Sequence, residues 1–250
     1  MPAEQTPRSA RAQLVALADA VAAGRGGGGF EGFANMPRPT DPRTSAVLLL
    51  FGVLDGVPSD HEAHARAVSR DLDVLLLERA STLRSHPGQI AFPGGRLDPD
   101  DDGPVAAVLR EAVEETGLDP SGVEVLGTLE TLPLATSQHL VTPVVGWWRQ
   151  PSPVRVVDVA ESADVFRAPV ADLLDPANRG VTVINRDGQK WRGPGFLVPR
   201  FDERGERDGE HVVWGFTAML LEGLFDRLGW TEPWDRHREI PLVLPEVEPR

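Results

Sequence analysis

Short runs of valine and leucine alternate with polar segments along most of the chain. Runs bounded by polar loops predict β-strands at 45–54, 72–80, 123–132 and 140–148. A shorter strand is expected at 164–170, followed by one helical turn that ends before Pro176. The segment 181–191 has Asp187 and Gly188 between two apolar runs, which is typical of a hairpin.

Helical spacing is found near both ends of the chain. Ser9 is a candidate N-cap, and the apolar residues at 14, 17, 18 and 21 recur at helical spacing until the glycine-rich run 24–29, which is typical of a flexible linker. We expect this helix to pack on the main domain; a separate functional arm is the alternative. A charged surface loop is expected at 200–211, then a strand leading into a helix at 211–228. These elements predict a mixed α/β or α+β domain.

The most clearly marked helix covers about 104–116. Pro104 suits a first helical turn, aspartates precede it, and Gly117 is a natural residue just past the end. One side of this helix is expected to face the core, and it carries Val105, Val108, Leu109, Ala112 and Thr116.

Three glutamates, Glu111, Glu114 and Glu115, fall together beside that apolar stripe. Like charges at this spacing repel by about 0.2–0.5 kcal/mol per pair, so a solvated acidic face softened by Arg110 is one interpretation. The glycine-rich loop 92–95 favours another, because carboxylates and bare backbone carbonyls are the oxygen ligands that hard cations such as Mg²⁺ prefer. Such a site suggests metal-assisted attack of water on a phosphoryl group.

Composition narrows the function classes. The chain has 250 residues, which suits one domain with extensions, and a net charge of −13 without a basic stripe, which argues against nucleic-acid binding. There is no cysteine, so disulfides and thiolate chemistry are excluded. The longest apolar run, 46–54, is too short to span a membrane, and we find no convincing signal peptide, so we expect a cytoplasmic protein.

The stretch from Gly95 to Leu118 resembles the Nudix box, the loop-helix-loop motif of pyrophosphate hydrolases. Residues 110–118, REAVEETGL, match the second half of the motif at each required place. In the first half, counting back from Arg110 puts Asp102 at the first glutamate of the motif and Arg96 at its glycine. One extra loop residue restores Gly95. The first acidic position then remains open among four aspartates, Asp98, Asp100, Asp101 and Asp102.

Residues 76–95, LLERASTLRSHPGQIAFPGG, resemble the signature of the coenzyme A pyrophosphatase branch of this family. The resemblance covers roughly 45–228 and implies a Nudix fold: an α+β, α/β/α sandwich with a mixed β-sheet between helices. It also implies three parts: an N-terminal helix and linker over 1–29, a Nudix hydrolase domain over 30–235, and a C-terminal tail over 236–250.

The resemblance assigns roles residue by residue. Glu111 and Glu115 are expected to be the main metal ligands with the carbonyl of Gly95, while Glu114 is a further ligand or holds the attacking water, and Arg110 orients the glutamates. An extra acid from outside the box is expected at Glu161 or Asp164, with a polar loop as the alternative for each. The residues expected to bind substrate are Arg79, Arg84 and Gly94.

The implied reaction is Mg²⁺-dependent cleavage, with Mn²⁺ as an alternative metal, of coenzyme A or acyl-coenzyme A. The products are adenosine 3′,5′-bisphosphate and 4′-phosphopantetheine or its acyl form. Another nucleoside diphosphate derivative, such as ADP-ribose or NADH, is the first alternative. A non-catalytic binding module is the second, although all three box glutamates are present. The sequence does not determine the oligomeric state, for which a homodimer is one alternative. His86 and His139 are interpreted as bystanders, and Trp147, Trp148 and Trp214 as adenine-stacking or core residues.

Overall fold

The computed structural model describes residues 9–26, 30–34, 36–53, 58–83, 86–134, 137–186, 189–202 and 204–242. The helices are α1 (Ala10–Ala22), α2 (Glu31–Ala34), α3 (Gly103–Thr116), α4 (Val170–Leu174) and α5 (Gly215–Leu228), with 3-10 turns at Pro120–Gly122 and Pro176–Asn178. The first strands are β1 (Arg43–Val53), β2 (Leu72–Arg79), β3 (Ile90–Ala91), β4 (Gly94–Arg96), β5 (Val123–Thr128) and β6 (Leu132–Leu134). The later ones are β7 (His139–Trp148), β8 (Ser162–Pro169), β9 (Arg179–Arg186), β10 (Gln189–Phe201), β11 (Arg207–Val213) and β12 (Glu239–Ile240).

The larger sheet is mixed, as the sequence predicts. Its strand order is β3-β2-β1-β7-β5, with β4 paired to β1, β6 to β7 and β8 to β2. The β1–β7 pair is parallel, with Ser45 opposite Val141, and the other pairs are antiparallel.

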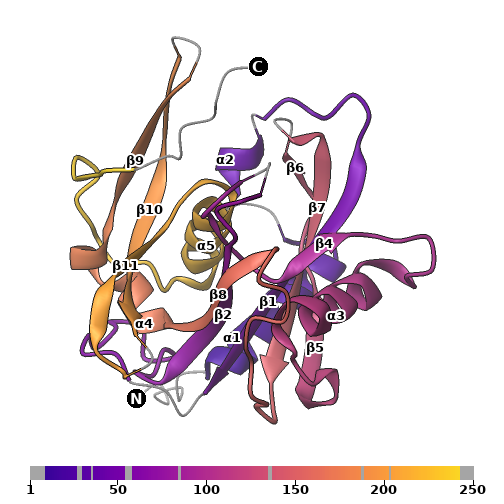
Figure 1. The fold of residues 1–250 in the computed structure, drawn as a ribbon, viewed down its shortest axis with the longest axis horizontal. Helices are drawn as coiled ribbons and strands as arrows, with labels where there is room; N and C mark the ends of the chain where they lie inside the picture. The colour runs from indigo at the N-terminus through magenta and orange to yellow at the C-terminus, as the bar shows by residue number, and fades with distance from the viewer. Residues whose placement is uncertain are drawn as a thin grey trace, which may run out of the picture.

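Alternating side chains on β1 separate two hydrophobic clusters. Leu48 and Leu50 pack with Val108 and Ala112 of α3, whereas Leu49 and Phe51 belong to a larger cluster on the opposite face that includes residues of α1 and α5. The sheet therefore lies between helices on both faces, with α3 on one side (Figure 1). This confirms the α+β class and the layered arrangement.

The smaller sheet has the order β11-β10-β9-β12 and packs against α5 (Figure 1). Gln189 of β10 lies opposite Arg186 of β9, so the two strands form the expected hairpin, whose predicted turn at Asp187 and Gly188 lies outside the described residues. The predicted surface loop at 200–211 is wrong. Instead β10 and β11 form a second hairpin, closed where the backbone N–H of Asp202 donates to the carbonyl of Glu206 at 2.8 Å.

Helix α1 packs against β5 and α5. The Ser9 side chain accepts a hydrogen bond from the Ala12 N–H at 3.3 Å, as expected of an N-cap, and Leu14 is fully buried. Arg11 forms an ion pair with Glu124 of β5. The amino-terminal helix is thus attached to the sheet by both apolar and charged contacts.

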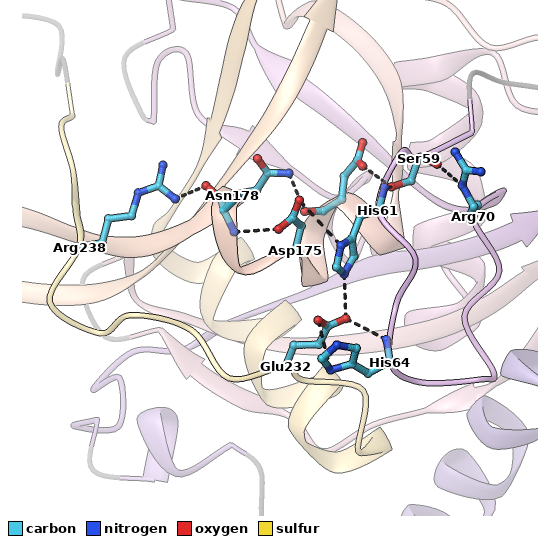
Figure 2. Close-up of polar contacts among 10 residues, drawn as sticks. Ser59, His61, His64, Arg70, Asp175, Asn178, Glu232 and Arg238 are labelled. Atoms are coloured by element: carbon cyan, nitrogen blue, oxygen red, sulfur yellow. Dashed lines mark hydrogen bonds and ion pairs between the residues drawn. The ribbon is translucent and has the colours of Figure 1, made fainter.

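The segment after α5 fastens distant parts of the chain together. Figure 2 shows the buried Glu232 carboxylate between His61 and His64: it lies 2.9 Å from His61 Nε2 and accepts the His64 backbone N–H at 3.0 Å. Farther along, β12 pairs with β9 in parallel, inside the range that the sequence assigns to a tail. Among the described residues, no helix is both long and apolar enough to cross a membrane.

Candidate active site

Two glycines bring β4 close to its neighbours. Gly94 has φ of 150°, and a Cβ there would overlap the carbonyl oxygen of Ala46 on β1. A Cβ on Gly95 would overlap the Glu111 carboxylate of α3. Gly94 therefore requires bare backbone, whereas a side chain at Gly95 would displace the Glu111 carboxylate from its position.

Glu115 is the buried member of the three glutamates, with only 8% of its surface exposed. One of its carboxylate oxygens accepts the Gly94 N–H at 2.9 Å. Burial, and then the charges of Glu111 and Glu161, raise the pKa of Glu115 to about 7, although the Gly94 hydrogen bond and the charge of Arg79 act the other way. The sequence places this residue beside the core stripe, whereas the structure turns it inward.

The other two glutamates share one donor. Arg110 NH1 donates to Glu111 Oε1 and to Glu114 Oε2, each at 3.1 Å. Burial raises the pKa of Glu111, while Arg110 lowers it. The side chain of Glu114 is 57% exposed, so its carboxylate is the one most open to water.

Asp101 holds the rest of the Arg110 guanidinium. Arg110 Nε donates to Asp101 Oδ1 at 3.1 Å, and NH2 donates to Oδ2 at 2.9 Å, a bidentate pair that lowers the pKa of Asp101. Asp98 lies farther from NH2, at 3.6 Å, and the Asp102 side chain makes no capping hydrogen bond. Asp101 follows Gly95 by six positions, as the motif glutamate would, so the extra residue lies between Asp101 and Arg110.

Arg79, the last residue of β2, lies near enough to Glu115 for its charge to act on that carboxylate. Its Nε is buried and has no hydrogen-bond partner within the described ranges. The next residue, Ala80, donates its N–H to the carbonyl of Glu161 at 2.9 Å, which holds Glu161 beside this strand end. Arg84, the second arginine predicted to bind substrate, lies outside the described residues.

The other predicted acid, Asp164, lies in a different environment. It sits opposite Glu78 in the β2–β8 pair, and the His211 ring of β11 lies between them, 3.4 Å from Asp164 and 3.2 Å from Glu78. Successive residues of a strand face opposite sides of the sheet. Glu78 therefore lies beside His211, whereas the charge of Arg79 acts on Glu115.

Comparison with known proteins places this geometry in a family. The NUDIX domain model matches residues 60–180. The chain is 36% identical over 151 residues to the Nudix hydrolase NudL of Photorhabdus laumondii, a match that covers 60% of this chain and 74% of that protein. The chain belongs to the Nudix hydrolase family. The stretch from Gly95 to Leu118 that resembles the Nudix box lies within the matched residues, and we refer to it below as the Nudix box.

Two further matches show how much of each protein is similar to this chain. Nudix hydrolase 15, mitochondrial, of Arabidopsis thaliana is 37% identical over 184 residues, which are 72% of this chain and 56% of that relative. The chain thus spans little more than half the length of this plant protein. The NUDIX domain of Shewanella oneidensis NrtR, crystallised with ADP-ribose, aligns with a TM-score of 0.40 at 23% identity, over 58% of this chain and 84% of that one.

The Nudix box offers oxygen donors of the type that a hard divalent cation binds. Glu111 and Glu115 contact the Gly94–Gly95 backbone, and the charge of Glu111 raises the pKa of Glu115, a repulsion that a cation would relieve. Within the described part of the chain, no group of three or more His, Cys, Asp or Glu side chains is already arranged to hold a metal ion. A cation would have to draw these carboxylates together as it binds.

Several polar pairs near the box were not expected from the sequence. Ser45 Oγ lies 2.6 Å from His139 Nδ1, although 94 positions separate the two residues. The Glu78–His211–Asp164 cluster likewise joins three distant segments. No local spacing signals such pairs, because strand pairing alone brings them together. The Trp148 side chain is buried in the cluster under α3, which makes it a core residue.

Proposed function

We propose that this Nudix hydrolase cleaves the diphosphate bond of coenzyme A or acyl-coenzyme A with the help of Mg²⁺. The observation that carries the proposal is the arrangement of the box. Two glutamates lie against bare glycine backbone, a third is exposed to solvent, and one arginine spans Glu111 and Glu114. Nudix hydrolases generally use divalent cations such as Mg²⁺.

Each box residue has a part that fits its surroundings. Glu111 and Glu115, with the carbonyl of Gly95, would hold the cation, and Mn²⁺ would suit the same oxygen ligands. The cation would offset the charge of the diphosphate and promote attack by water. Glu114 is exposed, and within the described residues its carboxylate accepts a hydrogen bond from Arg110 NH1, so it can accept a proton from water. Arg110, fixed by Asp101, keeps Glu114 and Glu111 in place.

Arg79 supports a diphosphate substrate. Its buried Nε is a donor without an acceptor in the described structure, and its positive charge already acts on Glu115. A guanidinium so placed is suited to a phosphate oxygen beside the metal ligands. Arg79 also belongs to the segment 76–95 that resembles the coenzyme A branch, and we assign the same role to Arg84 from that resemblance, with Gly94 as a backbone contact.

Of the two acids outside the box, the geometry favours Glu161. Its charge acts on Glu115, and its carbonyl is bonded to the residue after Arg79. Asp164 is instead paired with His211, which lowers the pKa of its carboxylate.

The test is to incubate the purified protein with coenzyme A and Mg²⁺, in parallel with ADP-ribose and NADH, and to identify products by mass spectrometry. We expect adenosine 3′,5′-bisphosphate and 4′-phosphopantetheine from coenzyme A. The Glu114→Gln variant should lose this activity, and the Glu62→Gln variant, altered at an exposed residue outside the box, should keep it. Faster cleavage of ADP-ribose or NADH would refute the assigned substrate, and a fully active Glu114→Gln variant would refute the assigned mechanism.

A further inference from the structure

Four basic side chains gather at the start of β1 and β7, next to the glycine loop. Arg43 lies opposite His139 in the parallel β1–β7 pair, and Ser45 lies opposite Arg96 in the antiparallel β1–β4 pair. Because Arg43 and Ser45 are two residues apart, and residues paired directly across strands share a face, Arg43, Arg96 and His139 lie on one face of the sheet. We call these three residues the basic cluster. His86 is near enough for its charge to act on His139.

The ring of His139 is fixed and its setting is positive. Ser45, which is buried, holds the ring Nδ1 at 2.6 Å. Burial lowers the pKa of His139, and the charges of Arg43, Arg96 and His86 lower it further. Like charges placed together repel one another, and an anion bound among them would relieve this repulsion.

The two arginines of the basic cluster have no internal counter-ion. Both side chains are exposed, and neither takes part in an ion pair with a carboxylate in the described part of the chain. The chain as a whole carries a net charge of −13, so carboxylates outnumber cations. Unpaired guanidinium groups are well suited to bidentate contacts with phosphate.

The basic cluster adjoins the Nudix box. Arg96 directly follows Gly95, and its carbonyl accepts a hydrogen bond from Arg110 NH2 at 3.2 Å. Its side chain faces away from α3, on the side opposite to Glu111. Among the described strands, β4 pairs only with β1. Arg96 thus belongs both to the short strand that carries Gly95 and to the basic cluster.

We propose that Arg43, Arg96 and His139 form an anion subsite that binds a phosphomonoester of the substrate, separate from the diphosphate that is cleaved. A phosphomonoester carries a charge of about −1.5 to −2 at pH 7, which matches two arginines. In coenzyme A this group is the 3′-phosphate of the adenosine half. The inference rests on the proposed function and extends it, since Arg79 then serves the diphosphate and the basic cluster determines preference for a 3′-phosphorylated nucleotide.

The test compares coenzyme A with 3′-dephospho-coenzyme A, which differ by this one group. The measured quantity is the ratio of kcat/KM for the two substrates in the wild type, in Arg43→Ala and in the Arg43→Ala/Arg96→Ala double variant. We expect the wild type to prefer coenzyme A and the double variant to lose about tenfold or more of that preference, the effect of one charge-assisted hydrogen bond. Arg192→Ala is the matched control, because Arg192 is exposed and paired with Glu239 on the smaller sheet; its ratio should equal that of the wild type.

A ratio that is unchanged in the double variant would overturn the subsite, including the case in which both substrates lose activity equally. A binding measurement separates this failure from failure of the proposed function. By calorimetry, the wild type should bind adenosine 3′,5′-bisphosphate more tightly than AMP, and the double variant should bind both alike. If the wild type cleaves neither coenzyme A compound, the proposed function fails, and this binding difference still supports or overturns the subsite. Circular dichroism confirms that each variant is folded.

Discussion

The substitution Glu115→Gln should stabilise the metal-free protein and abolish its activity. Glu115 is buried, and its pKa in the folded protein is about 7, against an ordinary value of 4.5. Glutamine has nearly the same shape and retains an oxygen that can accept the Gly94 N–H, so it removes the buried charge with little change in packing.

The sign follows from proton binding. Between pH 4.5 and about 7, the folded protein keeps the Glu115 proton while the unfolded chain has lost it, so the contribution of Glu115 to stability falls as pH rises through this window. Above pH 7 the loss is complete. Since one pH unit corresponds to 1.36 kcal/mol, it amounts to about 3 kcal/mol as an order of magnitude. Removal of the charge should recover this amount at pH 8 and almost none at pH 4.

The assay is urea unfolding with EDTA present, at pH 5 and at pH 8, for the wild type, Glu115→Gln and Glu114→Gln. We expect Glu115→Gln to exceed the wild type in free energy of unfolding only at pH 8. Glu114→Gln should show no such gain, because the Glu114 side chain is largely exposed. Added Mg²⁺ should stabilise the wild type and have little effect on Glu115→Gln. A Glu115→Gln protein that is less stable than the wild type at pH 8 would refute the reasoning.

Three further predictions concern the surroundings of the box. Gly95→Ala should lower kcat/KM about a hundredfold, because it displaces the Glu111 carboxylate. Gly193→Ala should be nearly neutral, because there is open space around Gly193. Equal activity of the two variants in steady-state kinetics would contradict this prediction. Asp101→Asn should lower kcat roughly tenfold with little change in KM, because it weakens the support of the box arginine, and Asp100→Asn should not; the same rate assay decides. Glu161→Gln should raise the Mg²⁺ concentration for half-maximal activity roughly tenfold, and an unchanged metal titration would exclude Glu161 as the extra acid.

Signals from neighbouring residues in the sequence predict many of the helices and strands. Pro104 and Gly117 mark the ends of the box helix, which the structure places at Gly103–Thr116, with Gly117 in the left-handed conformation. Runs of valine and leucine bounded by polar loops predict the longer strands of the larger sheet. These features depend on residues within one or two turns of each other, so the sequence alone contains the physical information. One predicted strand, 123–132, is instead divided: β5 ends at Thr128 and β6 begins at Leu132, and β5 itself has a register shift against β7 between Val125 and Gly127.

The sequence also predicts which residues belong to the box, because the whole motif lies on one loop and one helix. It does not predict how these residues differ from one another. The burial of Glu115 depends on how α3 sits over β4, and the choice of Asp101 among four aspartates depends on the path of the loop. Spacing along the chain is the same for every such packing, so it cannot distinguish them.

Contacts between distant segments were decided by tertiary structure alone. The charges of Arg79 and Glu161 act on Glu115 because β2 and β8 pair in their particular register. Arg43, Arg96 and His139 lie on one face because β1 pairs with β4 and β7 in particular registers. A shift of one residue in any of these pairings would turn the side chains to the opposite face. The chain itself thus determines the catalytic motif, whereas strand register determines which charges surround it.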